Sequence, residues 1–413
     1  MFAKNSPSSP LYISKVSKVI FYCSLLWISG FFFSPTGQIH NQAYILLFVL
    51  PALWIVTTSK IVFKDFLKSK LFNLVLIFCI YYALSTLWGN FVDFNKQLSE
   101  IKRVLYLYAF WLVIFTTYYL EDKKISILNK TIIISALIGL CFNLIYFYGY
   151  LHNDLNTRFH GIGRFRNELW AAALLGALAI SMLTTSLQSY TKHKIFYFLM
   201  FCIFLIATLL THSRGPIISM IAVSYFAVLM SKISLKSKLS ILFVSALLLM
   251  APFLFHANFI QTDISRGQSY RLDLWLGFLD LAKNNLIIGY GAGTNVSIQS
   301  PSSLVDGWSH YHNAYLGSFI ELGLIGFTLH ILVVAYAILT GLRYRNHLPT
   351  NIALMVFIFS ALIGITFGQG MVTRMNAQWI VFWLPLAFII LRDLEVLQVR
   401  KVIVSRNLGK PNV

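Results

Sequence analysis

Apolar residues in this 413-residue chain gather into long runs, and short polar segments separate them. Most runs have the roughly 17–25 residues that an α-helix needs to cross the hydrocarbon core of a bilayer. The pattern predicts an all-α polytopic membrane protein with about twelve transmembrane helices. The predicted spans are 19–34, 41–59, 71–89, 103–120, 131–150, 168–187, 194–211, 215–231, 239–254, 313–341, 350–367 and 376–392.

The composition supports this class of protein. The chain is 58% hydrophobic and 11% charged, whereas a soluble domain carries about 25% charged residues. The helix bundle itself must therefore supply the core. All the cysteines fall inside apolar runs, where we expect them to act as small hydrophobic side chains and not as disulfide partners or metal ligands: Cys23, Cys79, Cys141 and Cys202.

The net charge of +19 comes mostly from lysines that flank the apolar runs. Such lysines set the orientation of a membrane protein and contact anionic lipid headgroups. The sequence has neither zinc-finger spacing nor a base-reading basic helix, so we expect membrane lipid, and no nucleic acid, as a partner. With a cytoplasmic N-terminus, 22 of the 33 basic residues lie inside. The positive-inside rule then predicts a multi-pass membrane protein with both termini in the cytoplasm.

The type of basic residue differs between the two predicted sides. Lysine accounts for 17 of the 22 inner basic residues, and arginine accounts for 8 of the 11 outer ones. Either residue satisfies topology, but the planar guanidinium group of arginine also grips phosphate oxygens in a bidentate way. The outer face is therefore predicted to bind an oxyanion. The alternative is that these arginines only snorkel toward lipid headgroups.

The predicted spans divide the chain into four segments. Residues 1–254 hold the first nine spans, 255–312 form one long periplasmic loop, 313–392 hold the last three spans, and 393–413 form a cytoplasmic tail. The loop is too long for a structureless helix connection.

Within this loop, residues 269–283 predict an amphipathic helix with Trp275 near its apolar face. The glycine-rich run 289–295 that follows predicts a flexible turn. It is not a phosphate-binding loop, because no strand precedes it and no Lys-Ser/Thr pair follows it.

Two arginines stand out as ligands for an anion. Arg214 lies at the outer tip between two spans, and Pro216 favours a helix start immediately after it. The free N–H groups and positive dipole end of that helix would face the same water layer as Arg214. Arg271 lies early in the loop helix, one turn before Trp275. The alternatives are an ordinary interfacial arginine in a tight turn and a solvated surface charge.

A third basic cluster precedes the span at 168–187. It contains Arg158, Arg164 and Arg166, and Asn167 is predicted to cap the next helix. The cluster either helps to bind the ligand or binds lipid headgroups, and the sequence leaves both open.

The segment from His310 to Leu316 supplies the candidate base. At a helix N-terminus beside arginines, a positive field disfavours the imidazolium form of His312, and a neutral imidazole is what a general base requires. In a helix that includes His312, Tyr315 would share its face. Glu321 would lie on the opposite face, where an intramembrane carboxyl group meets another helix. The alternative for His312 is a satisfied interfacial anchor.

His310 and His312 lie two positions apart without a third ligand nearby, so we predict no metal site.

Together these motifs resemble the O-antigen ligase family, within the superfamily that also holds O-antigen polymerases. The resemblance covers roughly residues 155–330. It comprises a Ser-Arg-Gly turn at 213–215, a Tyr-Arg-x-x-x-Trp helix from Tyr270 to Trp275 with a Gly-x-Gly stretch after it, a His-Asn-x-Tyr-Leu motif from His312 to Leu316, and Glu-x-Gly-x-x-Gly from Glu321 to Gly326.

The resemblance implies a Gram-negative glycosyltransferase of lipopolysaccharide synthesis. It would move O-antigen polysaccharide from undecaprenyl pyrophosphate to lipid A–core at the periplasmic face. The family's essential arginines map to Arg214 and Arg271, and its essential histidine maps to His312, with His310 as an additional histidine here. Direct attack by the acceptor predicts inversion at the anomeric carbon. The donor is already activated, so no nucleotide, metal or other cofactor is expected.

Alternatives remain at this point. An O-antigen polymerase would extend the glycan on the same carrier, and a protein O-glycosyltransferase would need a larger outer acceptor domain. A lipid-linked polysaccharide transporter belongs to a different class. It would place charged sites near the midplane and often show repeated halves, and neither feature is evident in this sequence.

Overall fold

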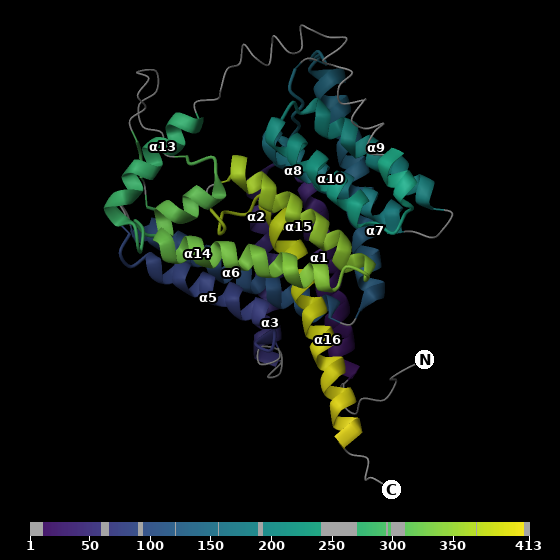
Figure 1. The fold of residues 1–413 in the computed structure, drawn as a ribbon, viewed down its shortest axis with the longest axis horizontal. Helices are drawn as coiled ribbons and strands as arrows, with labels where there is room; N and C mark the ends of the chain where they lie inside the picture. Colours follow the sequence, from purple (N-terminus) through teal and green to yellow (C-terminus); the bar gives the residue numbers. More distant parts are fainter. Residues whose placement is uncertain are drawn as a thin grey trace.

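The computed structural model is built from helices (Figure 1). It describes residues 11–58, 66–89, 94–119, 121–155, 157–188, 193–240, 271–294, 296–298, 310–368 and 370–408. No strand element occurs in these ranges, so the all-α prediction is confirmed for them. The count of twelve spans stays a prediction, because residues 241–254 of the ninth span lie outside the described ranges.

The first half of the chain forms a series of long helices joined by short turns. A π-helical turn joins α2 to α3, and another extends α7. The elements are α1 (Leu11–Phe33), α2 (Gly37–Tyr44), η1 (Ile45–Val49), α3 (Leu50–Thr58), α5 (Lys70–Ser85), α6 (Phe94–Tyr118), α7 (Asp122–Leu144) and η2 (Ile145–Tyr150).

The second half adds the loop helix, α13, and the remaining long helices. The elements are η3 (Gly163–Phe165), α8 (Glu168–Gln188), α9 (Lys194–Leu210), α10 (Arg214–Met230), α13 (Arg271–Ala282), η4 (Lys283–Asn285), α14 (Ala314–Arg343), α15 (Leu348–Thr366), η5 (Trp379–Trp383) and α16 (Leu384–Leu408). The helix predicted over 269–283 is therefore present as α13 in its described part.

By length and composition, five helices among the described residues can cross a membrane. They are Gly37–Thr57, Asp122–Tyr150, Glu168–Gln188, Ala314–Arg343 and Leu348–Thr366. Shorter apolar helices occupy Lys18–Phe33, Lys70–Ser85, Lys194–Leu210 and Arg214–Met230. Such apolar helices are typical of a membrane protein.

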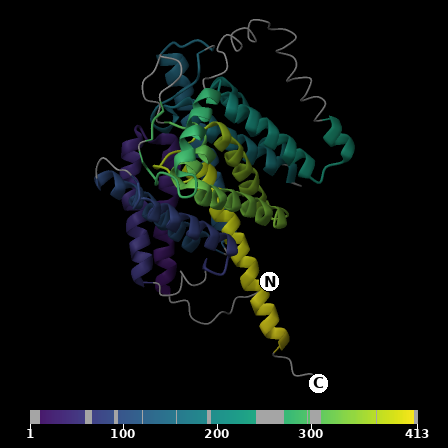
Figure 2. The same ribbon diagram turned by 60° about the vertical axis from the view of Figure 1, so that its left-hand side comes forward.

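The packing of α8 and α14 organises the bundle. Helix α8 packs against α9, α10 and α15, and α14 packs against α5, α13 and α15. Helix α13 lies at one end of the bundle, and the C-terminal part of α16 projects from the other end (Figures 1 and 2).

Two helices extend beyond the predicted spans. Helix α6 begins at Phe94 and not at 103, and its additional turns contain the ion pair between Glu100 and Arg103. Helix α16 continues to Leu408, through most of the segment predicted as a tail. Its Asp393 accepts hydrogen bonds from Ser69 Oγ (2.8 Å) and Tyr344 Oη (3.1 Å). A prediction from hydropathy ends a span where charged residues occur. In the structure these charges have partners, and the helix continues through them.

A break in α14 explains the glycine-rich run. Gly323 has φ +64° inside the helix, which frees backbone groups on both sides of it. The turn that follows α13 pairs with these groups: Gly291 N donates to Glu321 O (2.8 Å), and Leu324 N donates to Leu286 O (2.8 Å). The turn that was predicted to be flexible therefore supplies hydrogen-bond partners to the backbone groups at the break in α14, because buried backbone groups need partners.

Candidate active site

The His310–Asn313 segment enters α14 through a strained turn. Asn313 caps the helix by accepting hydrogen bonds from Tyr315 N and Leu316 N (both 3.0 Å). His312 precedes the cap, with φ +50°. Its backbone N–H donates to His310 Nδ1 (3.1 Å), and the two rings lie 4.1 Å apart. His312 therefore lies outside the helix. The prediction that it shares a helical face with Tyr315 is wrong, because the cap starts the helix after it.

Burial, and after it the neighbouring charges of His310 and Arg271, together lower the pKa of His312 to about 4. Burial also lowers the pKa of His310. The predicted neutral state of His312 agrees with these shifts. Desolvation is the largest cause, His310 comes second, and the arginine charge that the sequence pointed to comes third.

The charge of Arg271 acts on His312, and the charge of Arg158 acts on Arg271. Burial lowers the pKa of the half-buried Arg271, and the charge of Arg158 adds to this effect. Arg158 donates through Nε to Thr211 O and through Nη2 to Ser213 Oγ, both at 3.3 Å. Neither guanidinium forms an ion pair with an acidic side chain in the described part of the chain. Two like charges held together in this way favour an anion between or beside them.

Arg214 directly follows Ser213, a hydrogen-bond partner of Arg158. It is the exposed first residue of α10. A Cβ atom on Gly215 would lie 2.3 Å from Thr366 Oγ1, so the start of α10 lies directly against the end of α15. The structure thus connects His312, Arg271, Arg158 and the N-terminus of α10 through successive neighbours.

The structure separates the two remaining arginines of the third cluster. Arg164 donates to His40 Nδ1 (3.1 Å), Met375 O (2.7 Å) and Gly37 O (3.4 Å), and burial lowers its pKa to about 10. These protein acceptors occupy its guanidinium group, so Arg164 braces the outer loops. Arg166 is exposed. The sequence placed all three arginines in one cluster and could not single out Arg158.

Tyr311 ties the histidine segment to α13 and α14. Trp275 Nε1 donates to Tyr311 O (3.1 Å), and the Tyr311 ring packs edge-on against Phe278 at 4.8 Å. The Tyr311 hydroxyl hydrogen-bonds to the Glu321 carboxyl group. Burial raises the pKa of Tyr311 well above its usual value, and Glu321 adds to the rise. The hydroxyl therefore stays protonated and can donate.

Glu321 meets another helix, as its position in the sequence predicted. It lies close enough to Glu100 of α6 for their charges to interact, and its Oε2 accepts from Gly293 N (3.4 Å). Glu100 is paired with Arg103 and accepts from Tyr82 Oη (2.8 Å). Helices α5, α6 and α14 thus meet at one buried polar cluster. Buried groups of this kind are costly when one partner is removed.

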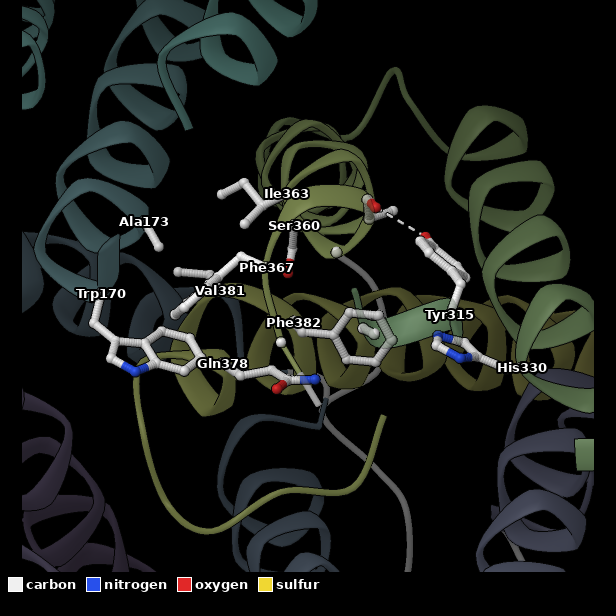
Figure 3. A pocket seen from close by; sticks show the side chains of 14 residues that line it. Trp170, Ala173, Tyr315, His330, Ser360, Ile363, Phe367, Gln378, Val381 and Phe382 are labelled. Carbon is white, nitrogen blue, oxygen red and sulfur yellow. Dashed lines mark hydrogen bonds between the residues drawn. The ribbon is translucent and has the colours of Figure 1, made fainter. Parts of the chain in front are cut away.

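The Tyr315 side chain contacts α15 and His330, and not His310 or His312. Its hydroxyl donates to Ala361 O (2.8 Å), and its ring stacks on His330 at 4.8 Å (Figure 3). His330 is also hydrogen-bonded to Ser318 Oγ (2.9 Å). The cavity that Tyr315 and His330 line with Trp170 has a volume of about 30 Å³. This is room for one or two waters at most, so Tyr315 joins α14 to α15.

A larger outer groove opens beside the histidines. It consists of two cavities of about 260 and 390 Å³ that share three lining residues, Asn167, Trp170 and Asn376. His310 and His312 line the first cavity, and Arg164 and Arg166 line the second. Together they fall in the ~300–1,000 Å³ range of small-ligand pockets.

Sequence reasoning missed one wall of this groove. The segment from Phe367 to Ala377 lies between α15 and η5, and Gln378 braces it by donating to Gly370 O (3.2 Å) and Met371 O (3.1 Å). A run of Gly, Thr, Arg, Asn and Gln between two predicted spans, on the same predicted side as His312, was the signal that could have found it. Asn167 was predicted as a helix cap, and it does accept from Leu169 N and Trp170 N.

Comparison with known proteins relates part of this sequence to a family. The family model described as O-antigen ligase matches residues 198–331. The chain is thus similar to the O-antigen ligase family over these residues. It is also similar to the O-antigen ligase of Pseudomonas aeruginosa, with 23% identity over 370 residues that cover 88% of each chain. These similarities support an enzyme of ligase or polymerase type in lipopolysaccharide synthesis.

The matched region contains part of the candidate site. Arg214, Arg271, His312 and Glu321 all lie within residues 198–331. Arg158, Trp170 and the 367–377 segment lie outside it. The groove is therefore assembled from the matched region together with α8 and the segment after α15.

Proposed function

We propose that this protein transfers O-antigen polysaccharide from undecaprenyl pyrophosphate to a sugar of lipid A–core, at the periplasmic face of a Gram-negative inner membrane. The observation that carries the proposal is that His312 lines an open groove and feels the charge of Arg271, which in turn interacts with Arg158. The similarity to O-antigen ligases makes a lipid-linked glycan donor and a lipid A–core acceptor the natural substrates.

The arginines are assigned to the pyrophosphate of the donor. Arg271 and Arg214 would hold its oxygens, as the family resemblance implies, and Arg158 lies where it can assist Arg271. Bidentate hydrogen bonds from arginine are strong and match phosphate geometry. They would stabilise the negative charge that develops as the carrier pyrophosphate departs.

His312 is assigned as the general base. The acceptor hydroxyl oxygen would attack the anomeric carbon and form a new C–O bond. The bond from that carbon to the pyrophosphate oxygen would break, and the hydroxyl proton would move to His312. Undecaprenyl pyrophosphate leaves with the bonding electron pair and needs no proton from an acid. Attack from the face opposite the leaving group gives inversion.

Donor binding would also strengthen the base. The charge of Arg271 contributes to the low pKa of His312, and a bound pyrophosphate would offset that charge. The pKa of His312 in the donor complex should therefore lie above its value of about 4 in the free protein. The base would become competent when the leaving group is in place.

The test is reconstitution of the purified protein with lipid-linked glycan and lipid A–core, without added nucleotide or divalent metal. Glycosylated lipid A–core should form with the wild type and should be absent with His312→Ala. Growth of the glycan on its carrier without use of lipid A–core would indicate a polymerase instead. Movement of the donor across proteoliposomes without any transfer would indicate a transporter.

A deletion strain gives an independent comparison. Loss of a ligase should leave long polymer on the carrier lipid. Loss of a polymerase should instead leave a single repeat attached to lipid A–core.

A further inference from the structure

The outer groove is lined by an aromatic ring and polar side chains that have no role in the transfer step proposed above. Trp170 of α8 lines both of its cavities and also the small cavity beneath them (Figure 3). The indole is half-buried, and Phe367 packs against it at 4.3 Å with the rings tilted by 66°. A partly exposed aromatic ring in a groove that is lined by both apolar and polar side chains is a platform for the C–H face of a sugar ring.

The groups around Trp170 are hydrogen-bond donors. Asn167 uses its Oδ1 to cap α8, and the amide nitrogen takes no part in this cap. Arg166 is exposed and lines the second cavity. Arg164 donates to Met375 O and so ties the turn that carries Arg166 to the opposite wall of the groove. Donors presented in this way suit hydroxyl oxygens and a negatively charged substituent.

The groove is lined by His312 and not by the arginines assigned to the pyrophosphate. His312 lines the first cavity, whereas Arg158, Arg214 and Arg271 line neither cavity among the described residues. If the pyrophosphate binds at those arginines, a nucleophile must approach the anomeric carbon from the face away from them. A sugar in the groove could present its hydroxyl to His312.

We infer that the outer groove is the acceptor subsite. Trp170 stacks on an acceptor sugar ring, Asn167 donates to a ring hydroxyl oxygen, and Arg166 pairs with an anionic substituent of the acceptor. Phosphate and carboxylate share this chemistry. This inference rests on the proposed transfer reaction and adds the class of acceptor that the site selects.

The experiment measures initial rates with purified full-length protein while lipid A–core and lipid-linked glycan are varied separately. In Trp170→Leu, which keeps an apolar side chain against Phe367, KM for the acceptor should rise about tenfold. KM for the donor should stay within about twofold of the wild type. Trp170→Phe keeps an aromatic face and should recover most of the loss.

Arg166 is tested against a matched control. Arg166→Ala should raise the acceptor KM about tenfold. Arg374→Ala, which removes the same charge from the neighbouring loop but not from the groove lining, should leave it unchanged. Phosphatase treatment of the acceptor should abolish the difference between wild type and Arg166→Ala if the anion is phosphate. A difference that survives this treatment assigns the anion as a carboxylate.

Two results would overturn the assignment. An unchanged acceptor KM in both Trp170→Leu and Arg166→Ala would remove the acceptor subsite, and a selective rise in the donor KM would place the donor glycan there. An equal effect of Arg374→Ala would mean that general charge, and not the groove, attracts the acceptor. Each of these requires an active wild type, so failure of the proposed transfer reaction is separately recognised by the absence of any product.

Discussion

The hydroxyl of Tyr311 hydrogen-bonds to the carboxyl group of Glu321, across the start of α14. Tyr311 directly precedes His312, and Glu321 lies in the buried cluster where α5, α6 and α14 meet. The position of the candidate base is therefore fixed from the interior of the bundle. Neither residue has to touch a substrate to influence catalysis, because a small displacement of a base lowers the rate.

Tyr311→Phe tests this link. The ring keeps its packing on Phe278, and the loss of one hydrogen bond should cost about 0.5–1.5 kcal/mol of stability. We expect kcat to fall about tenfold at an unchanged donor KM, since the base is displaced while the arginines are untouched. Tyr315→Phe is the matched control, because it removes the hydrogen bond to Ala361 O without altering the histidine segment. Equal kcat losses in the two variants would reduce the role of Tyr311 to general stability.

Substitutions at the two histidines distinguish their roles. His312→Ala should lower kcat about 10²–10⁴-fold, the usual contribution of a general base. His310→Asn can still accept the His312 backbone N–H through Oδ1 and should retain most of the activity, whereas His310→Phe cannot and should be impaired. Initial rates in the reconstituted system, with correct membrane insertion verified, provide the measurement. Full activity of His312→Ala together with loss in His310→Asn would exchange the two assignments.

Arg271→Lys keeps the positive charge and removes the bidentate grip. We expect kcat/KM for the donor to fall by about tenfold or more. Lys283→Ala is the control, because its ammonium group is exposed and pairs with Asp280 at 2.8 Å on the far part of the loop helix. Wild-type kinetics in Arg271→Lys would show that only charge is needed there.

The pH dependence of the rate follows from the depressed pKa of His312. A base is lost on protonation, so activity should fall as the pH drops below the pKa of His312. In the donor-free protein that value is about 4, and the acid limb of kcat/KM for the donor should lie there. The acid limb of kcat, which reports the bound complex, should lie at higher pH because the pyrophosphate offsets the arginine charge. Coincident limbs would argue against this coupling.

Gly323→Ala should destabilise the fold. Its φ of +64° disfavours any Cβ, and the added atom would lie 2.3 Å from Ile287 O and 2.5 Å from Gly289 N. Both of these contacts are with backbone, so we expect a loss of about 1–3 kcal/mol. Thermal unfolding in detergent gives the measurement. Gly149→Ala is the control, because its nearest contact would be an ordinary 3.8 Å.

Local patterns predicted much of the architecture. The apolar runs gave the helices, since an apolar segment in a bilayer must satisfy its backbone within itself. Asn167 and Pro216 marked helix starts, because the preferences for a helix start act over only a few residues. Glu321 was recognised as a carboxyl group that needs a partner on another helix, although the sequence could not name Glu100.

The sequence by itself determined the helical class, the loop helix and the residue types that suit an anion and a general base. Only the tertiary structure decided which arginine lies near the candidate base and which one is held by protein acceptors. Arg158 and Arg164 lie six positions apart in the same loop, yet one joins Arg271 near His312 and the other is occupied by His40, Gly37 and Met375. The difference arises because the partners of a polar side chain are distant in sequence. Hydrogen bonds between residues far apart in the chain produce no local sequence pattern from which they could be predicted.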